Sequence, residues 1–479
     1  MVIPQGLTFD DVLLIPQRSS LASRKEADTS SRLSQNITLK VPIISSNMDT
    51  VTESEMAIAM ALEGGIGFIH RFMSIQKEVE EVKKVKRAQS FVVEDPLTIT
   101  LQDQNVADVL DFIDKNKVTG ILVVNKDHQL IGILTRRDLA LEDDLNKKIA
   151  KIMTPRERII TGKPSTTLKE AKEILKINKI EKLPLVDQAG KLTGLITTKD
   201  ILHTIQSPNA QKDQKGRLMV GASIGVVGDY LERTEELVKA GVDVMVLDIA
   251  HGHADHTITC IKKLKSKFSS ITLVAGNVAT GEGTRDLIKA GADVVKVGVG
   301  PGSMCTTRIV TGHGVPQLTA IMEASQVARK YKIPIIADGG IRYSGDIVKA
   351  LAAGGSTVMI GSLLTGTQES PGMTVMKNGR KYKMARGMAS VAANWSRKMA
   401  DGKKDNYGLE EYVAEGVEAL VPYRGSAADI VRQLVGGLRS GMSYSGAKTI
   451  KELWKKAKFV QITGAGLKES FPHDVEVIQ

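Results

Sequence analysis

The segment 293–308, DVVKVGVGPGSMCTTR, carries a cysteine in a setting that suits a nucleophile. The valines at its start predict a strand buried on both faces, and the glycines that follow allow the backbone to approach a ligand closely. Cys305 therefore falls just past the carboxyl end of a strand, where α/β enzymes place their sites. A thiol beside the cation of Arg308 and loop amides tends toward the reactive thiolate. A free cysteine is usually a small core hydrophobe, but these neighbours favour chemistry.

The second cysteine, Cys260, lies in the helical pattern HTITCIKKLKSKF and is predicted to pack inside the protein. Two cysteines without metal-type spacing fit a reducing compartment and exclude a disulfide framework. The first residues lack a leader pattern, and no apolar run is long enough to span a bilayer. We therefore expect a cytoplasmic protein without a membrane partner.

The composition favours an α/β protein with more than one domain. The chain has 479 residues, 42% hydrophobic and only 4% aromatic, with 44 glycines for tight turns. The net charge of +11 comes from lysines spread over helical segments and not interleaved with aromatics. That pattern argues against nucleic acid and favours a solvated surface that also steers anionic small molecules.

Strand and helix patterns alternate outside one central segment. Between the first two strands, SEMAIAMALEGG predicts a helix with Ser54 as N-cap and glycines at its end. Each of the eight strands precedes a plausible helix, which predicts a closed (β/α)₈ barrel. The predicted strands are 41–46, 64–69, 218–222, 242–247, 271–275, 293–297, 333–337 and 357–360.

Polar residues gather at the carboxyl ends of these strands, where barrel enzymes place their active sites. This clustering is the strongest internal indication of an enzyme. Its members are Asn47, His70, Asp248, Asn277, the loop 298–308, Asp338, Gly361 and Ser362.

Two small-residue turns after the last two strands predict a phosphate cradle. Asp338-Gly339-Gly340 and Gly361-Ser362 offer backbone N–H groups at the usual phosphate position of this fold, although each alone could be a plain tight turn. Ser303 could join them from the cysteine loop. Asp248 suits the ribose hydroxyls of a dinucleotide, or it could cap the next helix.

The segment 91–207 holds an internal repeat. Residues 120–139 align without a gap to 182–201, and each copy predicts a hairpin followed by a helix. The pair resembles a tandem CBS (Bateman) module, which implies adenine or guanine nucleotides as ligands. By that likeness four residues would face ribose and phosphates, although helix N-capping explains them equally well. They are Thr135, Asp138, Thr197 and Asp200.

The motifs VKVGVGPGSMCTTR, SSNMDTVTE, DGGIRYSGD, RGMAS and AGLKESFPHD, with the paired repeat inserted after the second strand, resemble the IMP dehydrogenase and GMP reductase family. The likeness covers nearly the whole chain. It implies a TIM barrel formed by 1–90 and 208–479, interrupted by the tandem CBS module at 91–207.

The resemblance implies that Cys305 attacks C2 of a purine nucleotide. In a dehydrogenase, hydride passes from C2 of IMP to NAD, and water hydrolyses the thioimidate to XMP. In a reductase, the thiolate displaces ammonia from GMP, and NADPH returns a hydride to give IMP. Thr307 and Glu415 would assist the chemistry. Expected substrate-binding residues are Ser303, Asp338, Gly339, Gly340, Gly361, Ser362, Gly387, Met388 and Glu415.

Cofactor and ion sites also follow from the resemblance. The expected cofactor-binding residues are Asp248, Asn277, Gly298 and Gly300. A potassium ion would be held by carbonyls of Gly300, Gly302 and Cys305 and completed by a neighbouring chain's Glu469, Ser470 and Phe471. That arrangement implies a homotetramer; whether tetramers pair into octamers stays open.

The flap departs from the dehydrogenase pattern, since no adjacent Arg-Tyr pair occurs between Gly387 and Gly416. The nearest candidates are Arg397 and the pair Asn406-Tyr407. Asn47 is the reductase-like choice at its position, and Ala385 replaces a tyrosine that commonly touches the phosphate.

The whole-chain pattern predicts a cytoplasmic, NAD-dependent IMP dehydrogenase, with NADPH-dependent GMP reductase as the alternative. A regulatory nucleotide sensor or RNA-binding protein is a third hypothesis. The intact cysteine loop argues against it, because a sensor would not need that loop.

Overall fold

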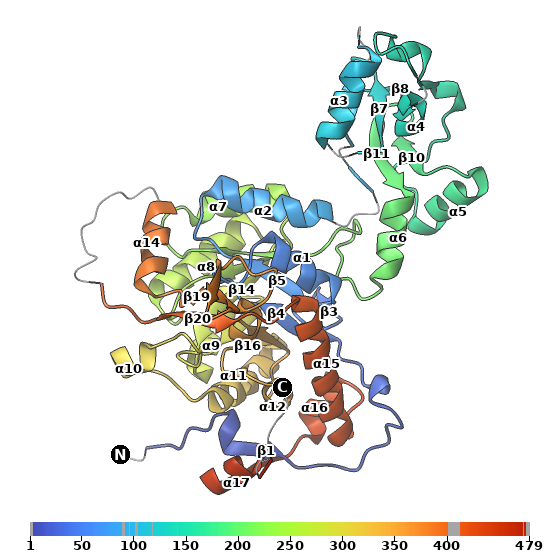
Figure 1. Ribbon diagram of the computed structural model, residues 1–479. Helices are drawn as coiled ribbons and strands as arrows, with labels where there is room; N and C mark the ends of the chain where they lie inside the picture. The colour runs from blue at the N-terminus through green and yellow to red at the C-terminus, as the bar shows by residue number, and fades with distance from the viewer. Residues whose placement is uncertain are drawn as a thin grey trace. The chain divides into compact units, whose positions relative to one another are not determined.

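The computed structural model describes residues 3–88, 92–94, 96–100, 104–116, 118–140, 142–400, 412–472 and 474–475. The chain divides into two compact units (Figure 1). The larger unit comprises Met1–Ala88, Asn209–Asp213 and Leu218–Gln479, and the smaller comprises Gln89–Pro208 and Gln214–Arg217.

The larger unit is built on a closed barrel of eight parallel strands, which confirms the predicted fold class. Each strand pairs in parallel with its neighbours around the ring (Figure 1). In barrel order the strands are β12 (Gly221–Ile224), β13 (Val244–Leu247), β14 (Thr272–Val278), β15 (Val294–Val297), β16 (Ile335–Asp338), β17 (Thr357–Ile360), β4 (Ile43–Ser45) and β5 (Ile66–Ile69).

Both faces of the barrel strands are buried, because one face fills the barrel and the other contacts the surrounding helices. Ile66, Phe68 and Val244 belong to an interior cluster, which Leu33 and Leu39 also join. Alternate residues such as Ile69 and Met245 belong to the outer core. The near-continuous apolar runs seen in the sequence follow from this two-sided burial.

Most predicted strand bounds shift by one to three residues, and one helix cap also needs correction. Strand β16 begins at Ile335 and not at 333, because Pro334 has no N–H to donate to a sheet. Helix α1 (Ser54–Leu62) has Glu53 as its N-cap, and the Ser54 backbone N–H instead donates to the Glu81 carboxylate at 2.8 Å. The predicted glycine end is confirmed, since Gly64 has a φ of +94°.

Helices follow the strands around the barrel and form its outer layer (Figure 1). Besides α1 they are α2 (Ile75–Ala88), α7 (Tyr230–Ala240), α8 (Asp255–Lys267), α9 (Gly281–Ala290), α11 (Gln317–Tyr331), α12 (Ser344–Ala352) and α15 (Ala427–Tyr444). The cysteine loop carries the short α10 (Thr307–Thr311), and α13 (Ser362–Thr365) begins directly after β17.

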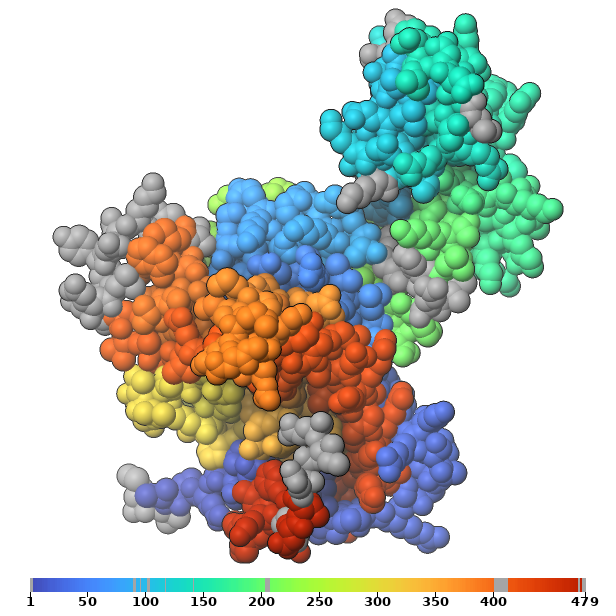
Figure 2. Space-filling view, viewed as in Figure 1, coloured from blue at the N-terminus to red at the C-terminus, as the bar shows by residue number. Residues whose placement is uncertain are grey.

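Between α13 and α15 the chain leaves the barrel as a three-stranded sheet of β18 (Thr374–Lys377), β19 (Arg380–Arg386) and β20 (Glu418–Pro422). Helix α14 (Val391–Ala400) follows β19. Strand β1 (Val12–Leu14), near the start of the chain, pairs with β21 (Phe459–Gln461), near its end, and Figure 2 shows their blue and red surfaces side by side.

The smaller unit contains the predicted repeat. Hairpin β7–β8 (Gly120–Val124, Leu130–Thr135) and hairpin β10–β11 (Lys182–Val186, Leu192–Thr197) carry a bulge at equivalent positions. Each follows an amphipathic helix, α3 (Val106–Asn116) or α5 (Leu168–Asn178). The two copies share an apolar cluster that includes Leu130 and Leu192, as expected if they bury each other's faces.

The threonine and aspartate pairs of the repeat form local caps. Thr135 donates from its hydroxyl to Asp138 at 2.7 Å before α4 (Arg136–Ala140), and Thr197 does the same to Asp200 at 2.6 Å before α6 (Thr198–Gln206). This geometry fits the capping interpretation. Nucleotide binding at these residues stays a prediction.

A buried ion pair joins α2 to α7. Arg233, only 2% exposed, donates to the Glu78 carboxylate at 2.5 Å and to Asp229 at 2.7 Å. Burial raises the pKa of Glu78 from 4.5 to about 8. Asp229 still balances the guanidinium when Glu78 is protonated.

The raised pKa of Glu78 predicts a pH-dependent stability. Between about pH 4.5 and 8 the folded state holds a proton that the unfolded state has lost, so the free energy of unfolding should fall as pH rises. Glu78→Gln cannot ionise and should flatten this part of the pH profile of the melting temperature. Glu80→Gln, on the exposed face of the same helix, should leave the slope unchanged. An unchanged slope in Glu78→Gln would contradict the assignment.

Candidate active site

A cavity of about 440 Å³ opens at the carboxyl ends of the barrel strands. It brings together every expected catalytic, substrate-binding and cofactor-binding residue. These are Cys305, Thr307, Glu415, Ser303, Asp338, Gly339, Gly340, Gly361, Ser362, Gly387, Met388, Asp248, Asn277, Gly298 and Gly300.

Backbone hydrogen bonds join three segments that are far apart in sequence. Thr306 N–H donates to the Glu415 carbonyl at 2.8 Å, and Val417 N–H donates to the Met304 carbonyl at 3.0 Å. Gly387 N–H reaches the Val417 carbonyl at 2.9 Å. The cysteine loop, the RGMAS turn and the VAEGVEAL segment are therefore held as one unit.

These backbone contacts align three side chains in a chain of hydrogen bonds. The Cys305 thiol donates to the Thr307 hydroxyl at 3.1 Å, and that hydroxyl donates to the Glu415 carboxylate at 2.7 Å. A proton can pass from sulfur through oxygen to the carboxylate along this path. The arrangement is that of a nucleophile with an attached base.

The structure places the two cysteines and Arg308 in different surroundings. Cys305 is partly exposed in the cavity. Cys260 is buried in α8, where burial raises its thiol pKa to about 12, which confirms a packing role. The Arg308 guanidinium donates to the Val315 carbonyl at 2.7 Å and braces the loop, and its effect on the thiol stays a prediction.

The predicted phosphate cradle has the close backbone approaches that require glycine. Gly339 and Gly340 have φ of +91° and +80°, a region that favours glycine. A Cβ at Gly361 would lie 3.0 Å from the Ser46 hydroxyl. Gly361 also precedes α13, so backbone N–H groups are free for an anion at that turn.

A buried lysine beneath the cavity holds Asp338. Lys296 is 6% exposed, and its ammonium donates to Asp338 at 2.8 Å and to the Asn277 side-chain oxygen. Asn277 in turn donates to the same Asp338 oxygen at 2.9 Å and to the Gly298 carbonyl at 2.7 Å. Asn277 therefore acts mainly on Asp338 in this structure. The lysine inside the buried run VVKV was the available signal for this contact.

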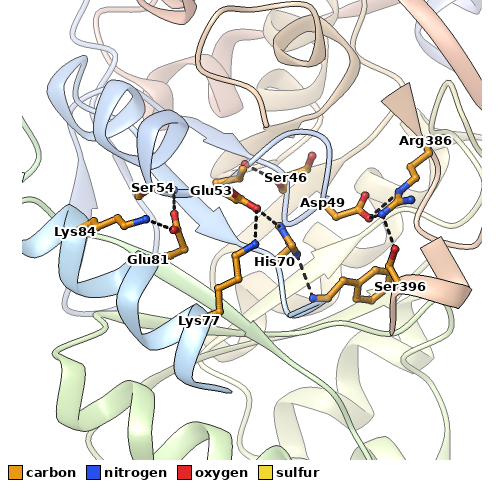
Figure 3. A network of polar contacts seen from close by, with 12 residues as sticks. Ser46, Asp49, Glu53, Ser54, His70, Lys77, Glu81, Lys84, Arg386 and Ser396 are labelled. Atoms are coloured by element: carbon orange, nitrogen blue, oxygen red, sulfur yellow. Dashed lines mark hydrogen bonds and ion pairs between the residues drawn. The ribbon is translucent and has the colours of Figure 1, made fainter. Parts of the chain in front are cut away.

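Asp248 lies in a charged network at the cavity rim. Arg71 donates to one carboxylate oxygen at 2.8 Å, and Asn47 donates to the other at 3.2 Å. His70, expected among the site residues, does not line the cavity. It is buried, accepts the Phe72 N–H and contacts Glu53 at 3.3 Å (Figure 3).

An ion pair ties the flap to the barrel. Arg386, at the end of β19, donates from Nε to the buried Asp49 carboxylate at 2.7 Å and from a second nitrogen to the Ser396 hydroxyl of α14 at 2.9 Å (Figure 3). Asp49 follows Asn47 and Met48, which line the cavity. This contact fixes α14 beside the site.

Removing Arg386 should destabilise the larger unit. Arg386→Met would leave the Asp49 carboxylate buried without its cation, which costs about 3 kcal/mol. Arg432→Met, on α15, breaks an exposed pair with Glu63 at the end of α1 and should cost less than about 1 kcal/mol. Thermal melting of both variants checks this, and equal melting temperatures would contradict a structural role for the Arg386 pair.

The described part of the flap places Arg397, a candidate from the sequence, at the cavity and adds Tyr412, which the sequence did not indicate. Arg397 lines the cavity and donates to Asn394 at 2.7 Å. Tyr412 also lines it and donates to the Ala389 carbonyl at 3.0 Å. Burial raises the pKa of Tyr412, while the charge of Arg397 opposes that rise. Asn406 and Tyr407 lie outside the described residues.

The expected potassium ligands divide into two groups. Gly300, Gly302 and Cys305 lie together in the cysteine loop. The tail residues Glu469, Ser470 and Phe471 do not line this cavity; the Phe471 ring lies 6.4 Å from that of Tyr343. Completion of an ion site by the tail of a neighbouring chain stays a prediction.

A cysteine with a hydroxyl–carboxylate relay lies beside glycine-rich turns and the half-buried Asp338 at the mouth of a (β/α)₈ barrel, which is the arrangement of a candidate enzyme active site. The family model described as the IMP dehydrogenase / GMP reductase domain matches residues 6–473. The chain belongs to that family and is an oxidoreductase.

IMP dehydrogenases and a GMP reductase are both similar to this chain over nearly their whole length. Inosine-5′-monophosphate dehydrogenases from Aquifex aeolicus and Nitrosopumilus maritimus are 55% and 52% identical, with 99% of this chain and 96% and 99% of theirs covered. The crystal structure of a GMP reductase from Trypanosoma brucei in complex with guanosine 5′-monophosphate is 46% identical, with 99% of both chains covered and a TM-score of 0.91.

None of the helices in the described part of the chain combines the length and apolar character that crossing a bilayer requires.

Proposed function

We propose that the protein is an IMP dehydrogenase. In this reaction a hydride leaves C2 of the purine while that carbon is covalently bound to Cys305, and water then replaces the sulfur. The Cys305–Thr307–Glu415 relay is the observation that carries the proposal. The higher identity to dehydrogenases than to the reductase favours the dehydrogenase direction.

The covalent step begins with loss of the thiol proton to Glu415 through Thr307. The thiolate then adds to C2 of IMP. NAD, when bound, supplies the acceptor for the hydride that leaves C2, so the base is oxidised and a thioimidate to Cys305 remains. Water attacks C2, the carbon–sulfur bond breaks, and XMP is released.

The same relay supports water activation in place of the missing Arg-Tyr pair. An ordinary guanidinium is a poor base because its pKa exceeds about 12. Once Glu415 has released the thiol proton to solvent, its carboxylate can accept the water proton through Thr307, whose hydroxyl it already accepts. That proton can return along the same path to the departing sulfur, which restores the Cys305 thiol.

Binding would use the contacts around the relay. The N–H groups of the cradle at Gly339, Gly340, Gly361 and Ser362 would hold the phosphate, together with Ser303. Asp338 would accept the ribose hydroxyls, because Lys296 and Asn277 occupy one carboxylate oxygen and leave the other. Asp248 would contact the cofactor ribose by exchanging its contact with Asn47 or Arg71.

A potassium ion fits the donor chemistry of the cysteine loop. Backbone carbonyls of Gly300, Gly302 and Cys305 are the neutral oxygen ligands that this ion favours. The Gly302 carbonyl already accepts the Cys305 N–H at 3.1 Å and has a second lone pair available. The tail of a second copy would complete the site in a homotetramer, and we expect this enzyme in the cytoplasm.

GMP reductase is the second candidate function. It is favoured by the missing Arg-Tyr pair, Asn47 and the similarity to the Trypanosoma brucei enzyme. In that direction Glu415 and Thr307 would deliver a proton to the departing ammonia, and NADPH would supply the hydride.

One assay separates the two directions. Pure protein is incubated with IMP and NAD, and separately with GMP and NADPH, while absorbance of the reduced cofactor is followed. A rise in the first mixture supports the dehydrogenase, and a fall in the second supports the reductase. No change in either would contradict the proposed chemistry.

A further inference from the structure

A second cavity lies at the opposite end of the barrel. Its volume is about 510 Å³, within the usual range for small-ligand sites. Ile335, the first residue of β16, and Ser356, just before β17, line it, so it opens at the amino ends of these strands. Its other walls come from the last turn of α11, from β2 (Ser31–Arg32), and from α16 (Ile450–Lys456).

Four cations and one carboxylate line this cavity. Arg32, Arg329, Lys332 and Lys451 line it, and Asp28 is its one carboxylate. Within the described residues, none of the four side chains forms an ion pair or a side-chain hydrogen bond. The cavity therefore has a local charge of about +3 from these five residues.

Favourable interaction with a helix dipole accounts for only two of the four cations. Arg329 and Lys332 lie at the end of α11, where cations complement the helix dipole. Lys451 lies in the first turn of α16, where a cation gains nothing from the dipole. Arg32 comes from β2, a separate segment that the bridge between Asp28 and Thr449 holds beside α16.

The side chains that line the cavity indicate the kind of ligand that it suits. Arg329 stacks over the Trp454 ring at 5.3 Å, and the Trp454 indole N–H donates to the Gly355 carbonyl, so both side chains are oriented. Hydroxyls of Ser31 and Ser356 are nearly buried in the wall. Cations and hydroxyl donors around a nucleotide-sized space suit a multivalent oxyanion.

We propose that this cavity binds the di- or triphosphate group of a small molecule, at a site separate from the catalytic cavity. The ligand bridges Arg32 and Lys451 across the cavity, with Arg329 held against Trp454. This inference does not depend on which direction the catalytic reaction takes.

Tryptophan emission tests the proposal directly, because the chain has only two tryptophans. In full-length protein carrying Trp395→Phe, Trp454 reports on the cavity. Titration with inorganic pyrophosphate should change its emission saturably, and a nucleoside triphosphate in a parallel arm shows whether a ring adds affinity. Tighter binding of the nucleotide identifies that source, and equal binding identifies the phosphates alone as the recognised group.

Matched variants distinguish binding in this cavity from nonspecific attraction of the anion to the positively charged surface. Arg32→Gln and Lys451→Gln should each weaken pyrophosphate binding by on the order of tenfold. Lys455→Gln on α16 and Lys330→Gln on α11 remove the same charge outside the cavity wall and should leave affinity unchanged. Emission that does not saturate in the parent, or equal weakening in all four variants, would overturn the proposal. If Arg32→Gln fails to fold, the comparison of pyrophosphate affinity between Lys451→Gln and Lys455→Gln tests the proposal by itself.

Discussion

Cys305→Ala should lose turnover by a factor on the order of 10⁴ or more, with nucleotide affinity largely retained. The alanine removes the only atom that can bond to C2, and the remaining contacts bind the nucleotide without forming the thioimidate. Steady-state kinetics and equilibrium nucleotide binding measure the two effects.

Cys260→Ala is the matched control for this variant. Its thiol is buried in α8, far from solvent, so the substitution should change stability by a small amount and leave turnover intact. Turnover that survives Cys305→Ala would remove the covalent mechanism. Equal loss in both variants would indicate a folding defect instead.

Thr307→Val should lower kcat by about 10²- to 10³-fold with little change in KM. The valine keeps the shape of the side chain but breaks the path from the Cys305 thiol to Glu415, so proton transfer loses its intermediate hydroxyl.

Thr307→Ser provides the test of that interpretation. Serine restores a hydroxyl between the thiol and the carboxylate, so kcat should return to within about tenfold of the parent value. Rapid-mixing kinetics of cofactor reduction then show which step slows. If Val and Ser variants behave alike, the hydroxyl carries no proton and Glu415 acts in another way.

The barrel was predictable because each strand can be identified from its own short run of residues. Each strand is a short run of Val, Ile and Ala that is buried on both faces, and eight such runs alternate with helices. Strand ends were less accurate, as at Pro334, because buried residues extend beyond the hydrogen-bonded ladder.

The site was predictable where its residues follow strands or belong to recognisable motifs. Cys305, Asp338 and Gly361 all lie where the strand pattern places them. Contacts between distant segments were not predictable, because sequence spacing does not show that Arg386 meets Asp49 or that Arg71 meets Asp248. The hydrogen bond from Arg308 to the Val315 carbonyl was not predictable for the same reason.

Mass spectrometry of protein quenched during turnover is the most direct test of the central claim. We expect a nucleotide adduct on the peptide that contains Cys305. The adduct should be absent from the peptide that contains Cys260 and absent without cofactor in the dehydrogenase direction. Steady turnover with an unmodified Cys305 peptide at every quench time would contradict it.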